Sequence, residues 1–115
     1  MKLKPNDYSR VKTIKKLVGT GLLSGDLKYN IFGTANVIIN NSNAVTHTAL
    51  DNLIEDSSDI ILLKVDTDGF DFDVLMSSKK ILSNSEPILF WENYIQEDFQ
   101  YNGYNELYSY LVELG

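Results

Sequence analysis

The residues best suited to chemistry are carboxylates that follow two apolar runs. Asp66 and Asp68 come just after the run at 60–65, and Glu92 comes just after the run at 88–91. Aliphatic and β-branched runs without polar alternation are typical of strands buried on both faces of a parallel sheet. Ligands of open α/β sheets bind beyond the carboxyl ends of the strands. We therefore take Asp66, Asp68 and Glu92 as candidate catalytic residues.

A helix is expected between these two strands, over residues 71–82. Its inward residues would be Val74, Leu75, Ile81 and Leu82. Asp71 and Asp73 suit the positive end of this helix, and Lys79 and Lys80 suit its negative end. Two strands joined by one helix and short loops form a right-handed βαβ unit. Such a unit places Asp66 and Glu92 at the same edge of the sheet.

The remaining elements are shorter or more peripheral. We expect a first helix that begins after Pro5 and Asn6, buries Val11, Ile14, Leu17 and Val18, and ends at Gly19. Strands are expected at 28–32 and 36–39, separated by Gly33, and near 45–48, with a polar turn at 40–43. A short helix is expected at 50–54. A final helix should run from Tyr104, with Leu107, Tyr108, Leu111 and Val112 on one stripe and its C-cap at Gly115.

Composition narrows the class of protein. The chain has 115 residues, a net charge of −6 and no cysteine. One α/β domain is expected, and nucleic acid is an improbable partner for an acidic chain without a long basic cluster. The sequence carries no run long enough to span a membrane and no signal-peptide core, so a cytoplasmic location is expected. The abrupt ends of the element pattern indicate a single partial domain over residues 1–115.

The acidic residues alone leave several chemistries open. Asp66 and Asp68 have the DxD spacing with which some glycosyltransferases hold a divalent cation and a nucleotide sugar. Haloacid-dehalogenase phosphatases also use two aspartates at this spacing, but Phe70 replaces their usual threonine. An EF-hand loop would need glycine and glutamate at positions that this segment does not match. A non-catalytic remnant that pairs with another copy through an exposed sheet edge is a further alternative.

Residues 46–93 resemble the FkbM-type family of S-adenosylmethionine-dependent methyltransferases. The matching residues are Leu50 and Asp51; Lys64, Val65, Asp66, Asp68 and Gly69; Asp71, Val74 and Leu75; Pro87, Phe90 and Glu92. The resemblance implies a Rossmann-like class I methyltransferase fold, here incomplete, with a partial parallel sheet and flanking helices. It also implies a transferase whose full-length parent uses S-adenosylmethionine to methylate an oxygen of a sugar or another small metabolite.

The resemblance also suggests residue roles. Asp66 would contact the cofactor and orient or deprotonate the acceptor, Asp68 would support it, and Glu92 would line the acceptor pocket. Asn6 would contact the cofactor in the turn that follows a family strand, although Lys4 stands where the family has an acidic ribose ligand. No metal ligand is expected.

Other polar and aromatic residues have simpler interpretations. The glycine pair around Thr20 follows an expected helix rather than a strand, so it fails the test for a cofactor loop. Asp51 is expected to cap or pack against the strand turn, and His47 to lie at a strand end on the surface. The helically spaced tyrosines are expected to pack rather than to form a stacking platform; they are Tyr94, Tyr101, Tyr104, Tyr108 and Tyr110.

Overall fold

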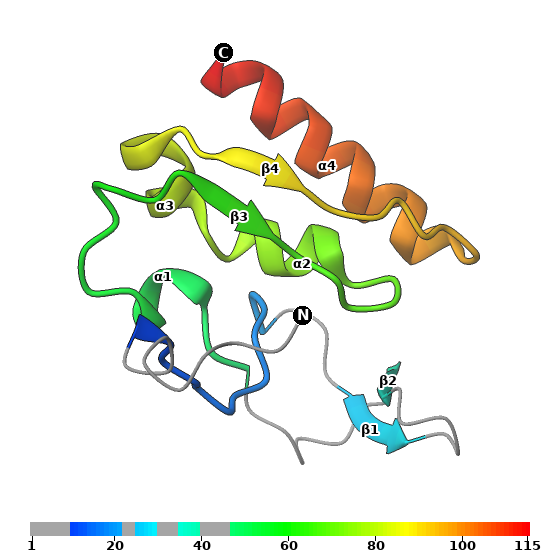
Figure 1. Ribbon diagram of the computed structural model, residues 1–115. Coiled ribbons are helices and arrows are strands. Elements are labelled where there is room, and N and C mark those ends of the chain that lie inside the picture. Colours follow the sequence, from blue (N-terminus) through cyan, green and yellow to red (C-terminus); the bar gives the residue numbers. More distant parts are fainter. Residues whose placement is uncertain (1–9, 22–24, 30–34, 40–46) are drawn as a thin grey trace.

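The computed structural model describes residues 10–21, 25–29, 35–39 and 47–115. Its elements are β1 (Gly25–Tyr29), β2 (Ala35–Ile39), α1 (Leu50–Leu53), β3 (Leu62–Lys64), α2 (Asp71–Met76), α3 (Lys79–Ser85), β4 (Ile88–Phe90) and α4 (Asp98–Leu114) (Figure 1). The predictions that concern Asn6 and the turn at 40–43 fall outside the described residues.

Strands β3 and β4 form the predicted parallel pair. Leu62 pairs with Ile88, Leu63 with Leu89 and Lys64 with Phe90. The backbone N–H of Val65 continues the ladder by donating to the Phe90 carbonyl at 2.9 Å. The pairing confirms the two neighbouring strands that the sequence predicts, with α2 and α3 as the crossover between them.

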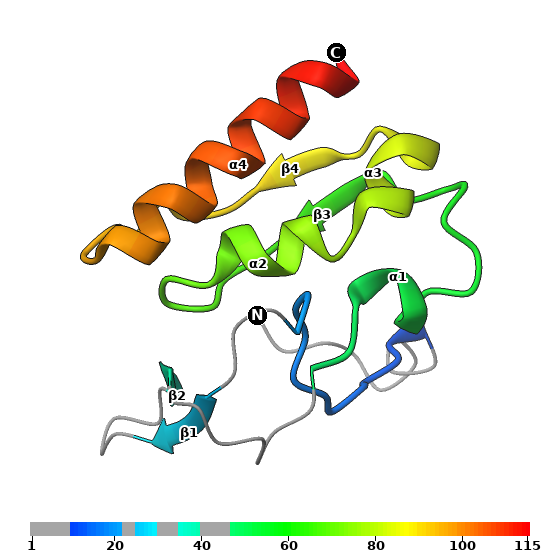
Figure 2. The ribbon, with the colours of Figure 1, turned by 180° about the vertical axis from the view of Figure 1, so that it is seen from behind.

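Helices α2 and α4 cover one face of this sheet (Figures 1 and 2). The core cluster consists of Val65, Phe72, Val74, Leu75, Tyr104 and Leu107, with Leu63 and Leu89 packed against it. The other face is open, because Leu62, Ile88 and Phe90 are 59%, 66% and 64% exposed. The expectation that both faces are buried is therefore wrong for the described residues: no described element covers the second face.

The crossover is two helices, where one was predicted over 71–82. Its inward residues are as predicted, because Val74, Leu75, Ile81 and Leu82 are all buried. At the break, the Ser77 and Ser78 hydroxyls donate to the carbonyls of Val74 and Leu75, each at 2.7 Å. Side-chain bonds of this kind compete with the helical ladder for the same carbonyls. They mark the point at which α2 ends and α3 begins.

The break changes the position of two lysines. Lys79 and Lys80 begin α3, so the prediction that they lie at the negative end of a helix is wrong. Asp51 supplies a negative charge at the N-terminus of α3, since its carboxylate accepts the backbone N–H groups of Lys80 at 2.9 Å and Ile81 at 3.0 Å. The predicted capping role of Asp51 is confirmed, with α3 as the helix that it caps.

The predicted first helix is absent from the described part of its range. Residues 11–17 have no regular structure, and Val18 forms a parallel bridge with Thr48. Val11 and Ile14 are 53% and 40% exposed. Leu17 and Val18 are partly buried, and Val18 packs against the core cluster. A short helix needs its whole apolar stripe packed, and the Val11 and Ile14 part of this stripe is exposed.

The hairpin and the small elements are closer to expectation. Strands β1 and β2 are antiparallel, with Lys28 opposite Asn36 and Gly33 in the connection between them. Strand β1 begins three residues before the predicted 28–32 segment. The strand expected near 45–48 is, in its described portion, the single bridge at Thr48. The short helix predicted at 50–54 is confirmed as α1.

Helix α4 begins at Asp98, six residues before the predicted start at Tyr104. The Gln100 side-chain oxygen accepts the backbone N–H groups of Gln96 at 2.7 Å and Glu97 at 3.0 Å, as in one half of a capping box. This pairing was missed in the sequence. Gly115 ends the helix as predicted, with φ of +90° and its N–H directed to the Val112 carbonyl at 3.2 Å.

Candidate functional site

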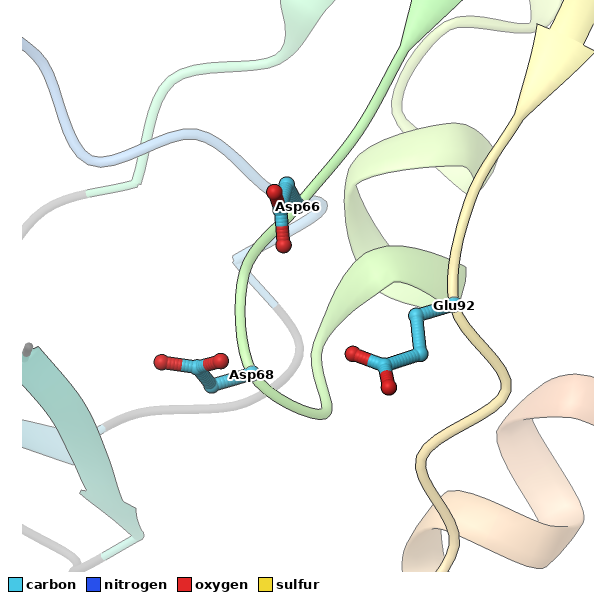
Figure 3. Close-up of side chains that lie close together, drawn as sticks. All are labelled: Asp66, Asp68 and Glu92. Carbon is cyan, nitrogen blue, oxygen red and sulfur yellow. The ribbon is translucent and has the colours of Figure 1, made fainter.

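Three carboxylates meet beyond the carboxyl ends of β3 and β4. Asp66 and Asp68 lie on the loop after β3, and Glu92 lies on the segment after β4 (Figure 3). One carboxylate oxygen from each of the three lies within 4.8 Å of the others, and all three side chains are exposed. The predicted convergence of Asp66 and Glu92 is confirmed, and Asp68 joins them.

Asp68 owes its position to a left-handed turn. Its φ is +52°, and Gly69 follows with φ of +105°. Asparagine, aspartate and glycine are the residues that accept this region most readily. A Cβ at Gly69 would also collide with the Gln100 side chain. The sharp turn keeps the carboxylate of Asp68 close to Asp66.

The two loops are joined by a buried carboxylate, Asp71. One of its oxygens accepts the Thr67 backbone N–H at 2.7 Å and the Thr67 hydroxyl at 2.5 Å. The other accepts the Glu92 backbone N–H at 2.9 Å. The side chain is 1% exposed, and it forms hydrogen bonds to a residue on each side of the site.

Two residues of α4 donate hydrogen bonds to the backbone of the same two loops. The Tyr104 hydroxyl donates to the Glu92 carbonyl at 2.7 Å. The Gln100 amide nitrogen donates to the Gly69 carbonyl at 3.2 Å. Burial raises the pKa of the Tyr104 hydroxyl to about 12, and the negative charge of Asp71 acts in the same direction. Tyr104 therefore remains a neutral donor throughout the physiological range.

The surface electrostatics of the site are modest. Lys64 lies 3.3 Å from Asp66, and both side chains are about 60% exposed (59% and 62%). An exposed pair of this kind contributes little to stability because water and salt screen it. Lys64 offsets part of the negative charge of the cluster, and Asp66 stays accessible to a ligand.

Two hollows border Asp66. One, of about 370 Å³, lies between β3, the start of α2 and residues 16–18, and is lined by apolar side chains such as Leu63, Phe70 and Val74. Its polar members are Lys16, His47, Lys64, Asp66, Thr67 and Asp73. The other, of about 330 Å³, is bordered by Lys64, Val65, Asp66, Phe90, Trp91 and Glu92. A concave apolar surface with a few convergent polar groups suits a small molecule.

The loop around Thr20 directly follows residues 16–18, which line the larger hollow, and it contacts α2. The backbone N–H and the hydroxyl of Thr20 donate to the two carboxylate oxygens of Asp73, at 3.1 and 2.5 Å. A Cβ at Gly19 would collide with Asp73, so only glycine permits this approach. The two hydrogen bonds from Thr20 to Asp73 hold the loop around Thr20 against α2. Contrary to expectation, the loop around Thr20 follows an irregular stretch and the Val18 bridge, and no helix precedes it at residues 11–18.

Some of the other residues singled out in the sequence lie where they were predicted, and others do not. His47 is half-buried and lines the larger hollow instead of lying on the open surface. Among the tyrosines, Tyr104 is 1% exposed, in the predicted packing role, whereas Tyr101 is 58% exposed. The residues that sequence reasoning missed are Gln100 and Tyr104 as site supports; Asp71 was foreseen only as a helix cap. Their roles depend on which loops meet, and no local pattern encodes that.

The arrangement can orient a hydroxyl acceptor. Carboxylates accept hydrogen bonds from sugar or alcohol hydroxyl groups, and a correctly placed one can take a proton as a general base. Oxygen ligands of this number and type also suit a hard divalent cation, although exposed acidic groups commonly occur without one. Among the described residues, no helix is long and apolar enough to cross a membrane.

The comparisons with known proteins agree with the sequence resemblance. The model of the family described as Methyltransferase FkbM domain matches residues 7–115, which is nearly the whole chain. No curated protein and no solved structure gives a match.

Proposed function

Because the chain belongs to the FkbM methyltransferase domain family, we propose that it supplies the acceptor side of an S-adenosylmethionine-dependent O-methyltransferase. The acceptor is a sugar or another small metabolite with a free hydroxyl group. Residues 1–115 form one methyltransferase-like domain, and β3, α2, α3 and β4 are part of its Rossmann-like class I fold. The observation that carries the proposal is the convergence of Asp66, Asp68 and Glu92.

Two features of the site support S-adenosylmethionine as the cofactor. S-adenosylmethionine, when bound, supplies an electrophilic methyl group on a positively charged sulfur. Exposed carboxylates favour a cation nearby, and the adjacent hollow of about 370 Å³ presents apolar side chains such as Leu63 and Val74. Asp66 would hold the cofactor at the edge of this hollow. Asn6 is a second proposed cofactor contact, and it lies outside the described residues.

The residues of this chain act mainly by positioning. Asp66 accepts the hydrogen bond of the acceptor hydroxyl and removes its proton as methyl transfer proceeds. Glu92 lies across the site and orients a second hydroxyl, and Asp68 supports Asp66 through its negative charge. Alignment of the two reacting groups supplies most of the rate enhancement in such a reaction, since no covalent intermediate with the enzyme is required.

The test is calorimetric titration of S-adenosylhomocysteine into the full-length parent, followed by a methyl-transfer assay with hydroxylated acceptors. Asp66→Asn should lower the turnover by a factor of about 10² to 10⁴, as loss of a general base does. Asp98→Asn is the matched control, because Asp98 is an exposed aspartate in the first turn of α4, and it should leave turnover unchanged. Manganese-dependent binding of a nucleotide sugar, without binding of S-adenosylhomocysteine, would refute the proposal in favour of the glycosyltransferase alternative.

The non-catalytic alternative predicts a different outcome. A self-association module should form dimers at micromolar concentration through an exposed edge of the β3–β4 sheet. It should bind neither S-adenosylhomocysteine nor a nucleotide sugar. Analytical ultracentrifugation of the chain in parallel with the titration separates this outcome from methyl transfer.

A further inference from the structure

The backbone of Glu92 is held from both sides by buried side chains. Its N–H donates to Asp71 at 2.9 Å, and its carbonyl accepts the Tyr104 hydroxyl at 2.7 Å. Asp71 and Tyr104 are each 1% exposed, whereas the Glu92 side chain is open to solvent. These two hydrogen bonds hold the backbone from which the Glu92 carboxylate extends.

Asp71 also fixes the opposite side of the site. Its second oxygen accepts both the N–H and the hydroxyl of Thr67, which lies between Asp66 and Asp68 in the chain. One carboxylate thus uses its two oxygens to join the loop after β3 to the segment after β4. Three negative charges close together repel one another, and this connection opposes the repulsion.

We propose that Asp71 and Tyr104 are positioning residues that set the distance of Glu92 from Asp66 and Asp68. Neither side chain reaches the acceptor, and both act through the backbone of Glu92. Their importance for methyl transfer rests on the proposed function above, but the positioning itself does not depend on it.

Tyr104→Phe separates positioning from packing. The ring of Tyr104 packs edge-on against Phe72, with centroids 5.2 Å apart, and phenylalanine keeps this contact. Only the hydroxyl that holds Glu92 is lost. Tyr101→Phe is the matched control, because Tyr101 lies on the same helix and is 58% exposed.

The readout is the affinity of Tb³⁺, measured by luminescence and used only as a probe of how closely the carboxylates approach. Tb³⁺ prefers several oxygen ligands at once, as Ca²⁺ does. We expect Tyr104→Phe to weaken Tb³⁺ binding about threefold or more although every carboxylate remains, with Glu92→Gln as the reference for full loss of one ligand. Hydrogen exchange of the Glu92 amide should accelerate in Tyr104→Phe relative to amides of β3.

Thr67→Val provides a second variant if Tyr104→Phe does not fold. It removes one hydroxyl donor to Asp71, keeps the volume of the side chain and should also weaken Tb³⁺ binding. Unchanged Tb³⁺ affinity in both variants, or a wild-type affinity no greater than that of Glu92→Gln, would overturn the inference. If the variants behave as expected but the parent neither binds S-adenosylhomocysteine nor methylates, the proposed function fails and the positioning inference stands.

If the parent is active, the two roles also separate kinetically. A displacement on the order of 1 Å at the reacting groups can cost a factor of about 100 in rate. Tyr104→Phe should therefore lower kcat per active site, counted by titration of S-adenosylhomocysteine sites, whereas a variant that only loosens the fold should lower the number of sites and leave kcat per site unchanged. Equal kcat in wild type and Tyr104→Phe would contradict the inference.

Discussion

Gly103→Ala is predicted to destabilise the chain, against the usual effect of this substitution in a helix. Gly103 lies within α4, and alanine in a helix interior is about 1 kcal/mol more favourable than glycine. In this structure, however, a Cβ at residue 103 would overlap three ring atoms of Phe72, all nearer than 3.0 Å. Ordinary contact between carbon atoms occurs at about 3.5–4.0 Å.

Phe72 has little room to move away from the added methyl group. It is 6% exposed, and its ring lies against those of Phe99 and Tyr104 with centroids 6.4 and 5.2 Å apart. Overpacking of a core by one methyl group costs about 1–3 kcal/mol. Subtracting the gain in helix propensity of about 1 kcal/mol leaves an expected net loss of up to about 2 kcal/mol in the free energy of unfolding.

The assay is urea denaturation followed by circular dichroism, with two comparison variants. Asn102→Ala changes the exposed neighbour and should stabilise the helix by a few tenths of a kcal/mol. Phe72→Leu in the Gly103→Ala background removes the ring that the methyl group meets, so the double-mutant cycle should show coupling between the two sites. A Gly103→Ala protein that is more stable than wild type by about 1 kcal/mol would refute the packing of α4 on α2.

Further predictions concern the core, a cap and pH. Leu75→Ala should cost about 2–5 kcal/mol in the free energy of unfolding by urea, because Leu75 is fully buried; a cost below 1 kcal/mol would contradict its place in the core. Asp51→Ala should cost about 0.5–2 kcal/mol by removing the acceptor for the first amides of α3, whereas Asp56→Ala, an exposed neighbour, should cost less. The pKa of Tyr104 is raised from 10.0 to about 12 in the fold, so its contribution to stability is complete below pH 10 and falls as the pH rises toward 12. Urea midpoints between pH 9 and 12 should therefore decline more steeply in wild type than in Tyr104→Phe, and equal slopes would argue against the buried hydroxyl.

The central strands could be predicted because their signal is local. The runs at 60–65 and 88–91 are apolar apart from Lys64, are bounded by polar turn residues and have no helical period, so strand was the consistent interpretation. Their parallel pairing followed from the helix between them, and the meeting of Asp66 and Glu92 followed from the pairing. Their burial on both faces did not follow, because burial depends on what covers the second face.

The errors have physical causes of a different kind. The stripe of Val11, Ile14 and Leu17 has helical spacing, but periodicity stabilises a helix only where an apolar surface receives it. The break after Met76 depends on whether the Ser77 and Ser78 hydroxyls turn back to the chain or toward solvent, and residue type does not decide that.

The central part of the site could be predicted only in outline. Asp71 was visible as an acidic residue at a helix start, a position where aspartate usually interacts with its own helix. In the structure, its carboxylate instead joins Thr67 to Glu92, residues that are distant in sequence. A role of this kind belongs to the assembled loops, so the sequence indicated the three exposed carboxylates but not the buried one that holds them together.

The capping of α3 by Asp51 has a consequence for the order of events during folding. Asp51 precedes Lys80 by 29 positions, so the second half of the crossover receives its terminal acceptor from a segment made much earlier by the ribosome. A seven-residue helix is too short to persist in water by itself. We therefore expect α3 to become stable only after the segment around α1 has docked, so that the two segments fold as one unit.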